Sequence, residues 1–493
     1  MCTTKISNQP ALSEGNNEGE ETVKGNGCVI NEIGMELLLL GRIVWPIIIS
    51  SFLLYSRSLI SMFFLGHLGH VQLAGGSLAI AFANITGYSV LRGLSMGMEP
   101  ICGQAFGAKK LSILSLTFQK TLLLLLLVTI PISLLWIKMR PILTHLGQEA
   151  EILTVAQEYV VFSLPDLMGQ ACLHPVRIFL RTQGLTKPLT LSATIAILLH
   201  IPINYVLVTY MGLGVKGVAL ASSWNTISID LGLLVYLIFS NIALKPWAGA
   251  SLACLYGWGP LIAFAVPSAI SVCLEWWWYE VILLLCGLLA DPESTVAATG
   301  ILIQTTGLLY VIPYSLSMGL STRVGHELGA NRPAQARRAT IVGLAVAIAC
   351  GLMAYAFTLS VKNIWGKMFT SDPKTLALTS AVLPLIGFCE LGNCTQTAGC
   401  GVLRGSARPT VGANINFGAF YIIGLPVAVL AGFQMGFGFF GLWLGLVAAQ
   451  VTCAGLMLCI VCHTNWVVQA ERAEELTGTA VEESDDLEER LLG

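Results

Sequence analysis

Twelve apolar runs, each long enough to cross a bilayer, restrict what this sequence can fold into. A helix that spans the ~30 Å hydrocarbon core of a membrane needs about 20 apolar residues. Only 11% of the 493 residues are charged, less than half the share typical of soluble domains. Runs of this length predict helices rather than the shorter, alternating strands of a barrel. We expect spans at residues 37–62, 72–100, 112–137, 152–174, 189–210, 215–240, 259–286, 296–321, 339–361, 377–399, 410–432 and 438–462.

The two halves of the chain repeat each other at an offset of about 221 residues. LSMGMEPICGQAFGA at Leu94–Ala108 aligns with LSMGLSTRVGHELGA at Leu316–Ala330, and Pro46 aligns with Pro267. Because each repeat has six spans, an even number, both halves enter the membrane in the same direction. We therefore predict an all-α integral membrane protein with twelve transmembrane helices, arranged in two parallel six-helix lobes related by pseudo-twofold symmetry around a central cleft.

These repeats divide the chain into two lobes, a linker and two tails. Basic residues favour the loops after even-numbered spans, twelve against six after odd-numbered spans. By the positive-inside rule, those loops and both termini lie in the cytoplasm. The expected segments are a disordered cytoplasmic N-tail (1–36), an N-lobe (37–240), an interlobe linker (241–258), a C-lobe (259–462) and an acidic cytoplasmic C-tail (463–493).

Several classes of function are excluded by what the sequence lacks. Its formal net charge is −2 and it has no Lys or Arg cluster, so no nucleic-acid partner is expected. It has no Walker A pattern, no nucleophile paired with a base and no closed set of metal ligands, so we expect neither an enzyme nor a metal site. GLGVKG and GFGFFG match the dinucleotide pattern GxGxxG, but they lie between spans rather than after strands. Any uphill work must therefore draw on an ion gradient.

Five motifs follow one another across both lobes. They are GHLG at 66–69, MEPICGQAFGAKK at 98–110, CLEWWWYE at 273–280, TRVGHELGA at 322–330 and CELGNCTQTAGCGVLRGSARP at 389–409. Together they resemble the multidrug and toxic compound extrusion (MATE) family, in its plant version, over residues 37–463. The resemblance implies cation-coupled antiport, usually driven by protons with sodium as the alternative ion, and no other cofactor.

The expected partners and membrane follow from this resemblance. The solutes are small organic molecules such as xenobiotics, metabolites or hormones, and we expect a monomer in a lipid bilayer. Plant members of the family export solutes from the cell or move them into vacuoles and vesicles. The chain ending EERLL at 488–492 is spaced like an adaptor-read sorting signal. We expect the plasma membrane or an endomembrane, namely vacuole, late endosome or Golgi.

Two carboxylates in one span are the first candidates for the transport site. A charged group inside a span costs about 2.5–3.5 kcal/mol on insertion scales, so Glu275 and Glu280 need a reason to be there. Five residues apart, they point about 140° from each other around a helix. We therefore expect one to line the cleft and the other to pair within its own lobe, with Tyr279 beside the former.

The second acidic position is Glu390. Asn393 and Thr397 follow it at helical spacing and form one polar stripe, with Gln396 adjacent. The resemblance implies that Glu275, Glu280 and Glu390 occupy the acidic positions of the substrate and proton cavity. Burial disfavours the charged form of a carboxylate. Such a group can therefore exchange a proton for a solute near neutral pH.

Three further positions qualify this prediction. Ser61 stands where bacterial members of the family carry an acidic residue, so the N-lobe is an unexpected place for a proton site. Gln304 replaces a glutamate of animal cation exporters, which weakens a restriction to organic cations. Arg57, in the middle of the first span, has two open interpretations: it pairs with a C-lobe carboxylate, or it binds an anionic group. Ion pairs of Glu99, Arg323 and Glu327 are candidates for a cytoplasmic gate.

Two other functions remain alternatives from the sequence. An uncoupled channel or facilitator would use the buried carboxylates for selectivity rather than for proton exchange. A scaffold that keeps the transporter fold would act through its acidic tail.

Overall fold

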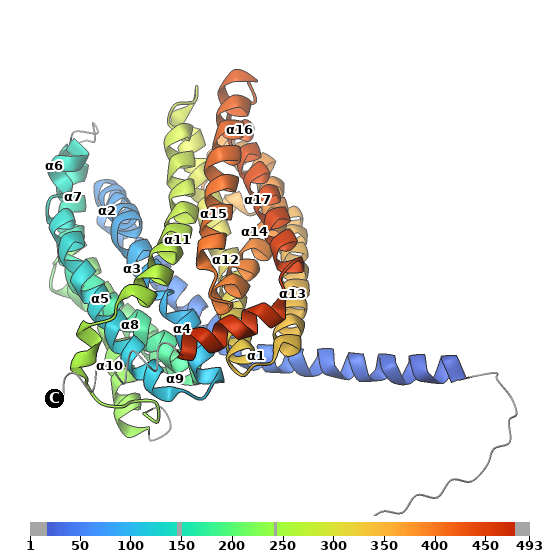
Figure 1. The fold of residues 1–493 in the computed structure, drawn as a ribbon. Helices are drawn as coiled ribbons and strands as arrows, with labels where there is room; N and C mark the ends of the chain where they lie inside the picture. Colours follow the sequence, from blue (N-terminus) through green and yellow to red (C-terminus); the bar gives the residue numbers. More distant parts are fainter. Residues whose placement is uncertain (1–16, 145–149, 241–243, 479–493) are drawn as a thin grey trace, which may run out of the picture.

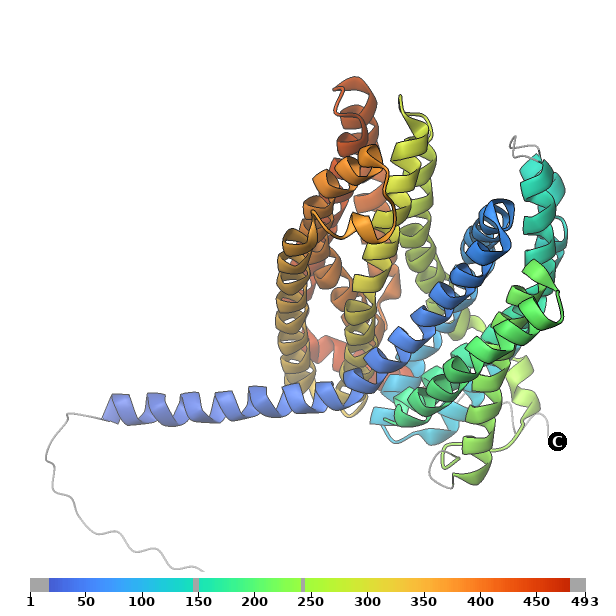
Figure 2. The ribbon, with the colours of Figure 1, turned by 180° about the vertical axis from the view of Figure 1, so that it is seen from behind.

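Two bundles of helices form a V, as Figure 1 shows. The structure is a computed structural model that describes residues 17–144, 150–240 and 244–478, and these residues contain helices but no strand. The bundles lie apart at one end, near α6 and α16, and meet at the other, near α4 (Figure 1). The view from behind shows the same separation (Figure 2). We call these the open end and the closed end.

The first bundle is the N-lobe, which runs from α1 to α10. Its elements are α1 (Asn17–Leu68), α2 (His70–Ala83), η1 (Asn84–Tyr88), α3 (Ser89–Ser95), α4 (Met98–Gly107), α5 (Leu111–Ile137), α6 (Met139–Thr144), α7 (Ala150–Phe162), α8 (Leu164–Thr182), α9 (Lys187–Asn204), η2 (Tyr205–Tyr210) and α10 (Gly214–Phe239). Its core is a cluster of aliphatic side chains around the fully buried Trp136.

The second bundle is the C-lobe, which runs from α11 to α17 after the short helix η3 (Leu252–Leu255) of the linker. Its elements are α11 (Gly259–Cys286), α12 (Pro292–Gly329), α13 (Pro333–Val361), η4 (Gly366–Met368), α14 (Pro373–Gly405), α15 (Pro409–Asn416), η5 (Phe417–Gly424), α16 (Leu425–Val429), η6 (Leu430–Gln434) and α17 (Gly438–Cys462). Trp278 and Trp443 lie at the centre of its core.

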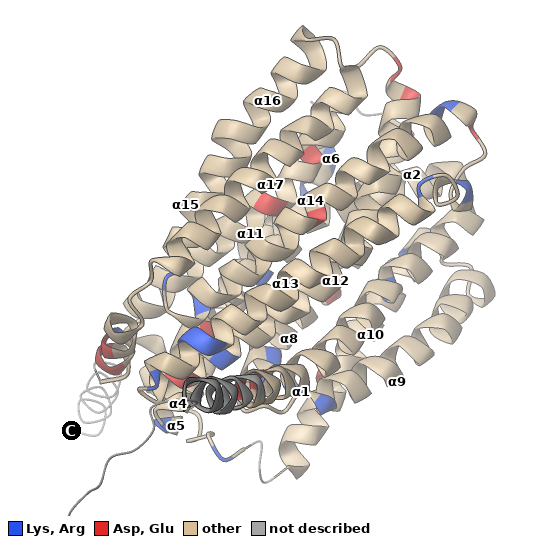
Figure 3. Cartoon of the chain, turned by 90° about the vertical axis from the view of Figure 1, so that its right-hand side faces the viewer, with Lys and Arg blue, Asp and Glu red and all other residues tan. Residues whose placement is uncertain are grey.

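Most of the expected spans are single helices. The described residues hold eleven helices that are long and apolar enough to cross a membrane. The expected fourth span, 152–174, is instead the pair α7 and α8, interrupted at Ser163 and continued to Thr182. Pro165, at the start of α8, has no N–H to continue the hydrogen bonding of α7. Figure 3 shows that most helix residues are uncharged, and that acidic residues lie partway along the bundle as well as near its ends.

α1 differs most from the sequence prediction, because part of the tail expected to be disordered is helical. The helix begins at Asn17, within the expected N-tail 1–36. Its residues Leu40 and Val44 pack against Leu316 and Leu320 of the C-lobe, whereas its second half contacts α2 and α9 of the N-lobe. The apolar run predicts the span, whereas the preceding segment is held by ion pairs of Glu32 with Arg338 and of Glu36 with Arg323, in a distant part of the chain. α1 therefore connects the two lobes (Figure 2).

The expected acidic C-tail 463–493 also begins with ordered structure. Residues 466–478 form a helix, and Trp466, Ala470 and Ala473 pack into the same cluster as α12 and α13. The first part of the expected tail is thus attached to the C-lobe. The EERLL ending lies outside the described residues, as do residues 1–16 of the expected N-tail.

Small residues bring the two lobes together at the closed end. α3 packs against α11, and α4 packs against α12. A Cβ atom built on Gly97 would lie 2.4 Å from the Cα of Ala265, and one on Gly325 would lie 3.3 Å from the Cα of Gly103. Glycine permits such close approach of helix backbones. The glycines shared by the two repeats therefore form the interface that closes this end.

Replacing Gly97 should open the closed end. In Gly97→Val the new side chain meets the backbone of Ala265, and overpacking of this kind costs about 1–3 kcal/mol. We expect spin labels at the exposed Ser112 and Gln335, one on each lobe, to give a distance distribution shifted to longer values in lipid nanodiscs. Gly300→Val is the control, since a Cβ at that helical glycine meets nothing within 4 Å. An unchanged distribution in Gly97→Val would contradict this account of the interface.

Candidate functional site

A cavity of about 540 Å³ lies between the lobes. Its N-lobe wall is formed by α1, α2, η1, α3 and α8, and its C-lobe wall by α11 and α12. Both walls carry charged residues, which have opposite sign. Glu275 and Glu280 lie on the C-lobe wall, whereas Arg92 and Arg177 lie on the N-lobe wall.

Glu275 and Glu280 both border this cavity, so the prediction that only one lines the cleft is wrong. Tyr279 and Trp276 border it as well. At 100° per residue, Tyr279, Trp276 and Glu280 lie about 40°, 100° and 140° from Glu275 around the helix. The cavity is wide enough to expose this whole arc of α11. The two carboxylates occupy the edges of the arc, and the two aromatic rings lie between them.

The three consecutive tryptophans of α11 have three different environments. Trp278 is fully buried in the C-lobe core, with its ring centroid 5.6 Å from that of Phe420. Trp277 donates a hydrogen bond of 3.2 Å from Nε1 to the carbonyl of Ile85 in the N-lobe. Trp276 borders the cavity. Trp278 thus holds α11 in its lobe, Trp277 contacts the facing lobe, and Trp276 is available to a solute.

Glu390 lies behind the cavity wall rather than on it. Its side chain is 1% exposed and accepts a hydrogen bond of 2.9 Å from Asn393 Nδ2. Thr397 Oγ1 donates to Asn393 Oδ1, and Gln396 Nε2 donates to Asn416 Oδ1. The predicted polar stripe therefore exists, but none of its residues borders the cavity. The reason is that α14 packs against α12, α13 and α17, which places it inside the C-lobe.

Tyr279 and Gln304 connect this inner region with the cavity and the facing lobe. Tyr279 borders the cavity and packs against the core cluster that contains Cys389, the neighbour of Glu390. Gln304 borders the cavity and accepts a hydrogen bond of 2.9 Å at Oε1 from the hydroxyl of Tyr55 on α1. The neutral amide of Gln304 thus joins α12 to α1 through this hydrogen bond and places no charge on the cavity.

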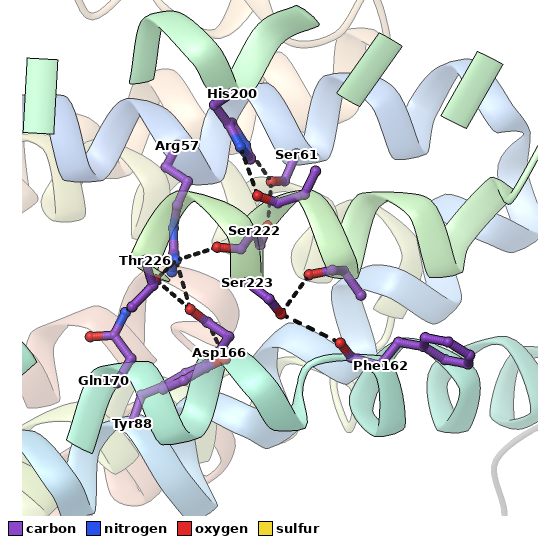
Figure 4. Close-up of polar contacts among 12 residues, drawn as sticks. Arg57, Ser61, Tyr88, Phe162, Asp166, Gln170, His200, Ser222, Ser223 and Thr226 are labelled. Carbon is purple, nitrogen blue, oxygen red and sulfur yellow. Dashed lines mark hydrogen bonds and ion pairs between the residues drawn. The ribbon is translucent and has the colours of Figure 1, made fainter. Parts of the chain in front are cut away.

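Arg57 pairs within its own lobe, so the interpretation that it pairs with a C-lobe carboxylate is wrong. Binding of an anionic group stays a prediction, since Arg57 also borders the cavity. Its Nη1 lies 3.1 Å from Asp166 Oδ1 and donates a hydrogen bond of 2.8 Å to Thr226 Oγ1 (Figure 4). Thr226 and the hydroxyl of Tyr88 also donate to the Asp166 carboxylate. Pairing between α1 and α8 depends on the fold of the N-lobe, and nothing in the spacing of these residues indicates it.

The neighbouring polar groups of the N-lobe satisfy one another around His200. Ser61 Oγ lies 3.1 Å from Ser222 Oγ and 3.4 Å from His200 Nε2, as Figure 4 shows. His200 Nδ1 lies 3.2 Å from the carbonyl of Ala221. The position that is acidic in bacterial relatives therefore holds part of a hydrogen-bonded network here.

Two arginines of the cavity were missed from the sequence. The guanidinium of Arg92 lies 3.9 Å from the ring centroid of Tyr314 and 5.2 Å from that of Trp276. The expected fourth span ends at residue 174, before Arg177, but α8 extends past Arg177 and places it on the cavity. Arg92 lies inside an expected span. A charged residue inside a span is a candidate for function, so the argument made for Glu275 and Glu280 applies to Arg92 as well.

A second charged cluster lies at the closed end. Glu99 of α4 accepts a hydrogen bond of 2.6 Å from Arg181 Nη2 in its own lobe. Across the interface, it accepts hydrogen bonds from Ser321 Oγ (2.7 Å) and Arg404 Nε (3.2 Å). Arg323 joins Glu36 of α1 to Glu327 nearby. The sequence indicated ion pairing here, but not that Glu99 itself bridges the lobes.

Comparisons with known proteins agree with this arrangement. The model of the MatE family matches residues 46–206 and 267–430, one segment in each lobe. Protein DETOXIFICATION 53 of Arabidopsis thaliana is 55% identical over 461 residues, which cover 93% of this chain and 95% of that protein.

Solved structures confirm the predicted two-lobe fold. The crystal structure of the eukaryotic MATE transporter AtDTX14 has a TM-score of 0.87 and 34% identity, and covers 90% of this chain and 100% of that one. An outward-facing multidrug resistance MATE family transporter of the MOP superfamily shares the fold at 16% identity, with a TM-score of 0.73 over 89% of this chain and 96% of that one.

Removing the charge of Glu99 should loosen the closed end. Glu99→Gln leaves Arg181 and Arg404 without their carboxylate, and breaking a buried pair in this way costs about 3–5 kcal/mol. We expect faster hydrogen exchange of the backbone amides in residues 98–107 and 316–325, measured by mass spectrometry. The control Glu158→Gln removes an exposed ion pair with Lys216 and should leave exchange in these segments unchanged. Equal exchange in both variants would contradict the bridging role of Glu99.

Proposed function

Because this chain belongs to the MATE family of multidrug and toxic compound extrusion transporters, we propose that it is a proton-coupled antiporter of small organic solutes. Members of this family are secondary transporters. Glu275 and Glu280 exchange protons for the solute, and Glu390 holds a further proton deeper in the C-lobe. The solute moves by alternating access between the two lobes.

The observation that carries this proposal is the state of the two cavity carboxylates. Glu275 and Glu280 border a cavity in the membrane-spanning region, and neither has a basic partner within 4.0 Å among the described residues. An unpaired charge at this depth is costly. Binding of a proton or of a positively charged group neutralises it. The two ligands therefore compete for the same carboxylates, which is the physical requirement for antiport.

Glu390 suits a different role because solute in the cavity does not reach it. The carboxylate is buried and receives a hydrogen bond from Asn393. Tyr279 borders the cavity, as Glu275 does, and packs against the core cluster that contains Cys389, the neighbour of Glu390. A proton held at Glu390 changes the electrostatic potential at Glu275. We therefore assign Glu390 to coupling rather than to solute contact.

The packing of the lobes supports alternating access. The cavity lies between two bundles that are apart at one end and joined at the other by glycine contacts and the Glu99 cluster. Rocking of one lobe against the other would exchange the open and closed ends. The closed end carries the loops rich in basic residues, and we assign it to the cytoplasmic side. In this state the cavity faces the exterior or the lumen of an organelle.

The remaining parts of the proposal concern partners and location. Both termini lie in the cytoplasm, and the protein acts as a monomer in the plasma membrane or in the membrane of the vacuole, late endosome or Golgi. The name of the Arabidopsis relative, DETOXIFICATION 53, fits export or sequestration of harmful compounds. Protons are the coupling ion, with sodium as the alternative that the same carboxylates would serve.

Neutralising the acidic residues should abolish coupled transport. In proteoliposomes with an imposed, dissipatable pH gradient, the wild type should accumulate a fluorescent organic cation. We expect accumulation to fall to the level of protein-free liposomes in Glu275→Gln and Glu390→Gln, because glutamine binds no proton. Accumulation should recover in neither variant when the gradient is made larger.

The control is Glu293→Gln, which removes an exposed carboxylate at the start of α12, outside the cavity. Normal transport by Glu275→Gln and Glu390→Gln would show that these groups are structural. Flux without accumulation, unaffected by the pH gradient, would instead identify a facilitator. Replacement of the proton gradient by a sodium gradient identifies the coupling ion.

A further inference from the structure

Two arginines of the cavity have no carboxylate partner in the described part of the chain. Arg92 and Arg177 both border the cavity, and neither lies within 4.0 Å of a carboxylate among the described residues. The other arginines that are buried or half-buried in the described spanning helices each pair with an acidic residue. These are Arg57, Arg181, Arg323, Arg338 and Arg404.

The position of Arg92 is fixed without neutralising its charge. Its guanidinium lies over the ring of Tyr314, with the carbon atom 3.9 Å from the ring centroid, and beside Trp276. Among the described residues, no hydrogen bond joins the Arg92 guanidinium to another group, and its contacts are those with the two rings. A guanidinium carries five N–H donors. The rings thus hold Arg92 in place, and its donors can bind a ligand.

Arg177 extends this positive region along α8. Gln170, His174 and Arg177 are spaced four and three residues apart, so they lie on one face of the helix, and all three border the cavity. Tyr314, whose ring contacts Arg92, borders the same cavity as Arg177. Two like charges in a cavity of low polarity repel each other. An anionic group bound between them would remove this repulsion.

The opposite wall carries the unpaired carboxylates. Glu275 and Glu280 face the same cavity as the two arginines, yet neither carboxylate forms an ion pair with them within 4.0 Å. Arg92 contacts Trp276, the residue that follows Glu275 on α11. The walls therefore have charges of opposite sign that attract each other but stay apart. A ligand with one charge of each sign would satisfy both.

Aromatic side chains occupy the region between these charges. Tyr310 and Tyr314 stack with ring centroids 5.9 Å apart, and Trp276 and Tyr279 continue the surface on α11. A planar apolar body would pack on these rings. A carboxylate would form the planar paired hydrogen bonds with a guanidinium that this group favours. An amine would compete with the proton for Glu275 or Glu280.

We propose that Arg92 and Arg177 form an anion-binding subsite, and that the cavity is selective for aromatic zwitterions bearing an amine and a carboxylate. This inference rests on the proposed function, since the amine end is the part that exchanges with protons. A purely cationic solute leaves the two arginines without a counter-ion. A purely anionic solute leaves the two carboxylates uncompensated and does not compete with protons.

Three probes with the same indole ring test this selectivity. Tryptamine carries the amine alone, indole-3-propionate the carboxylate alone, and tryptophan both. Isothermal titration of the purified protein in lipid nanodiscs at neutral pH gives the Kd of each without requiring transport. We expect tryptophan to bind at least about tenfold more tightly than tryptamine, the size expected of one charge-assisted hydrogen bond.

Two variants assign this preference to the arginines. In Arg92→Gln and Arg177→Gln the advantage of tryptophan over tryptamine should disappear, while tryptamine binding is kept or improved. Arg92→Lys keeps the charge without the planar donors and should retain part of the preference. Arg42→Gln is the matched control, because this arginine of α1 is exposed and does not border the cavity.

The inference is overturned if tryptophan and tryptamine bind equally, if none of the three probes binds at millimolar concentration, or if the preference survives in both glutamine variants. Its failure is distinguishable from failure of the proposed function. Gradient-driven accumulation of an organic cation without zwitterion preference would leave proton antiport standing and remove the subsite. Conversely, an arginine-dependent preference for tryptophan over tryptamine, without gradient-driven accumulation, would support the anion-binding subsite and contradict proton antiport.

Discussion

The structure depends on where charge can be tolerated inside a membrane. A charged side chain in this region needs a partner or access to water, because hydrocarbon provides neither. Arg57 and Asp166 meet this requirement within the N-lobe, and Glu99 meets it at the closed end with arginines from both lobes. Glu275, Glu280, Arg92 and Arg177, which form no ion pair within 4.0 Å among the described residues, lie on the cavity. This distribution separates groups that hold the fold from groups available to a solute.

The same requirement links the site to the motion of the lobes. At the closed end, the Glu99 cluster and the glycine contacts join the lobes, and α1 runs from one lobe into the other. Opening that end would break the bond between Glu99 and Arg404, so the change has an energetic cost. Across the cavity, Trp277 and Tyr55 also bond to the facing lobe. Binding of solute and protons therefore shifts an equilibrium between the state in which the Glu99 end is closed and the state in which it is open.

The sequence predicts the fold better than it predicts the site. Hydrophobic length and the internal repeat are properties of the chain itself, and they predicted the spans and the two lobes. How much of the circumference of α11 faces the cavity depends on the width of the cavity. The spacing of Glu275 and Glu280 therefore could not show that both carboxylates border it. Burial of Glu390 and pairing of Arg57 likewise depend on neighbouring helices. Arg92, in contrast, lay within an expected span and was open to prediction.

The central claim, that cavity carboxylates release protons when a solute binds, is tested most directly by counting those protons. Purified protein in weakly buffered solution near neutral pH is mixed with an organic cation, and a pH indicator records the protons that appear. The account predicts net release on binding, and loss of most of that release in a variant with both Glu275 and Glu280 changed to Gln. Binding without any proton release in the wild type would contradict it.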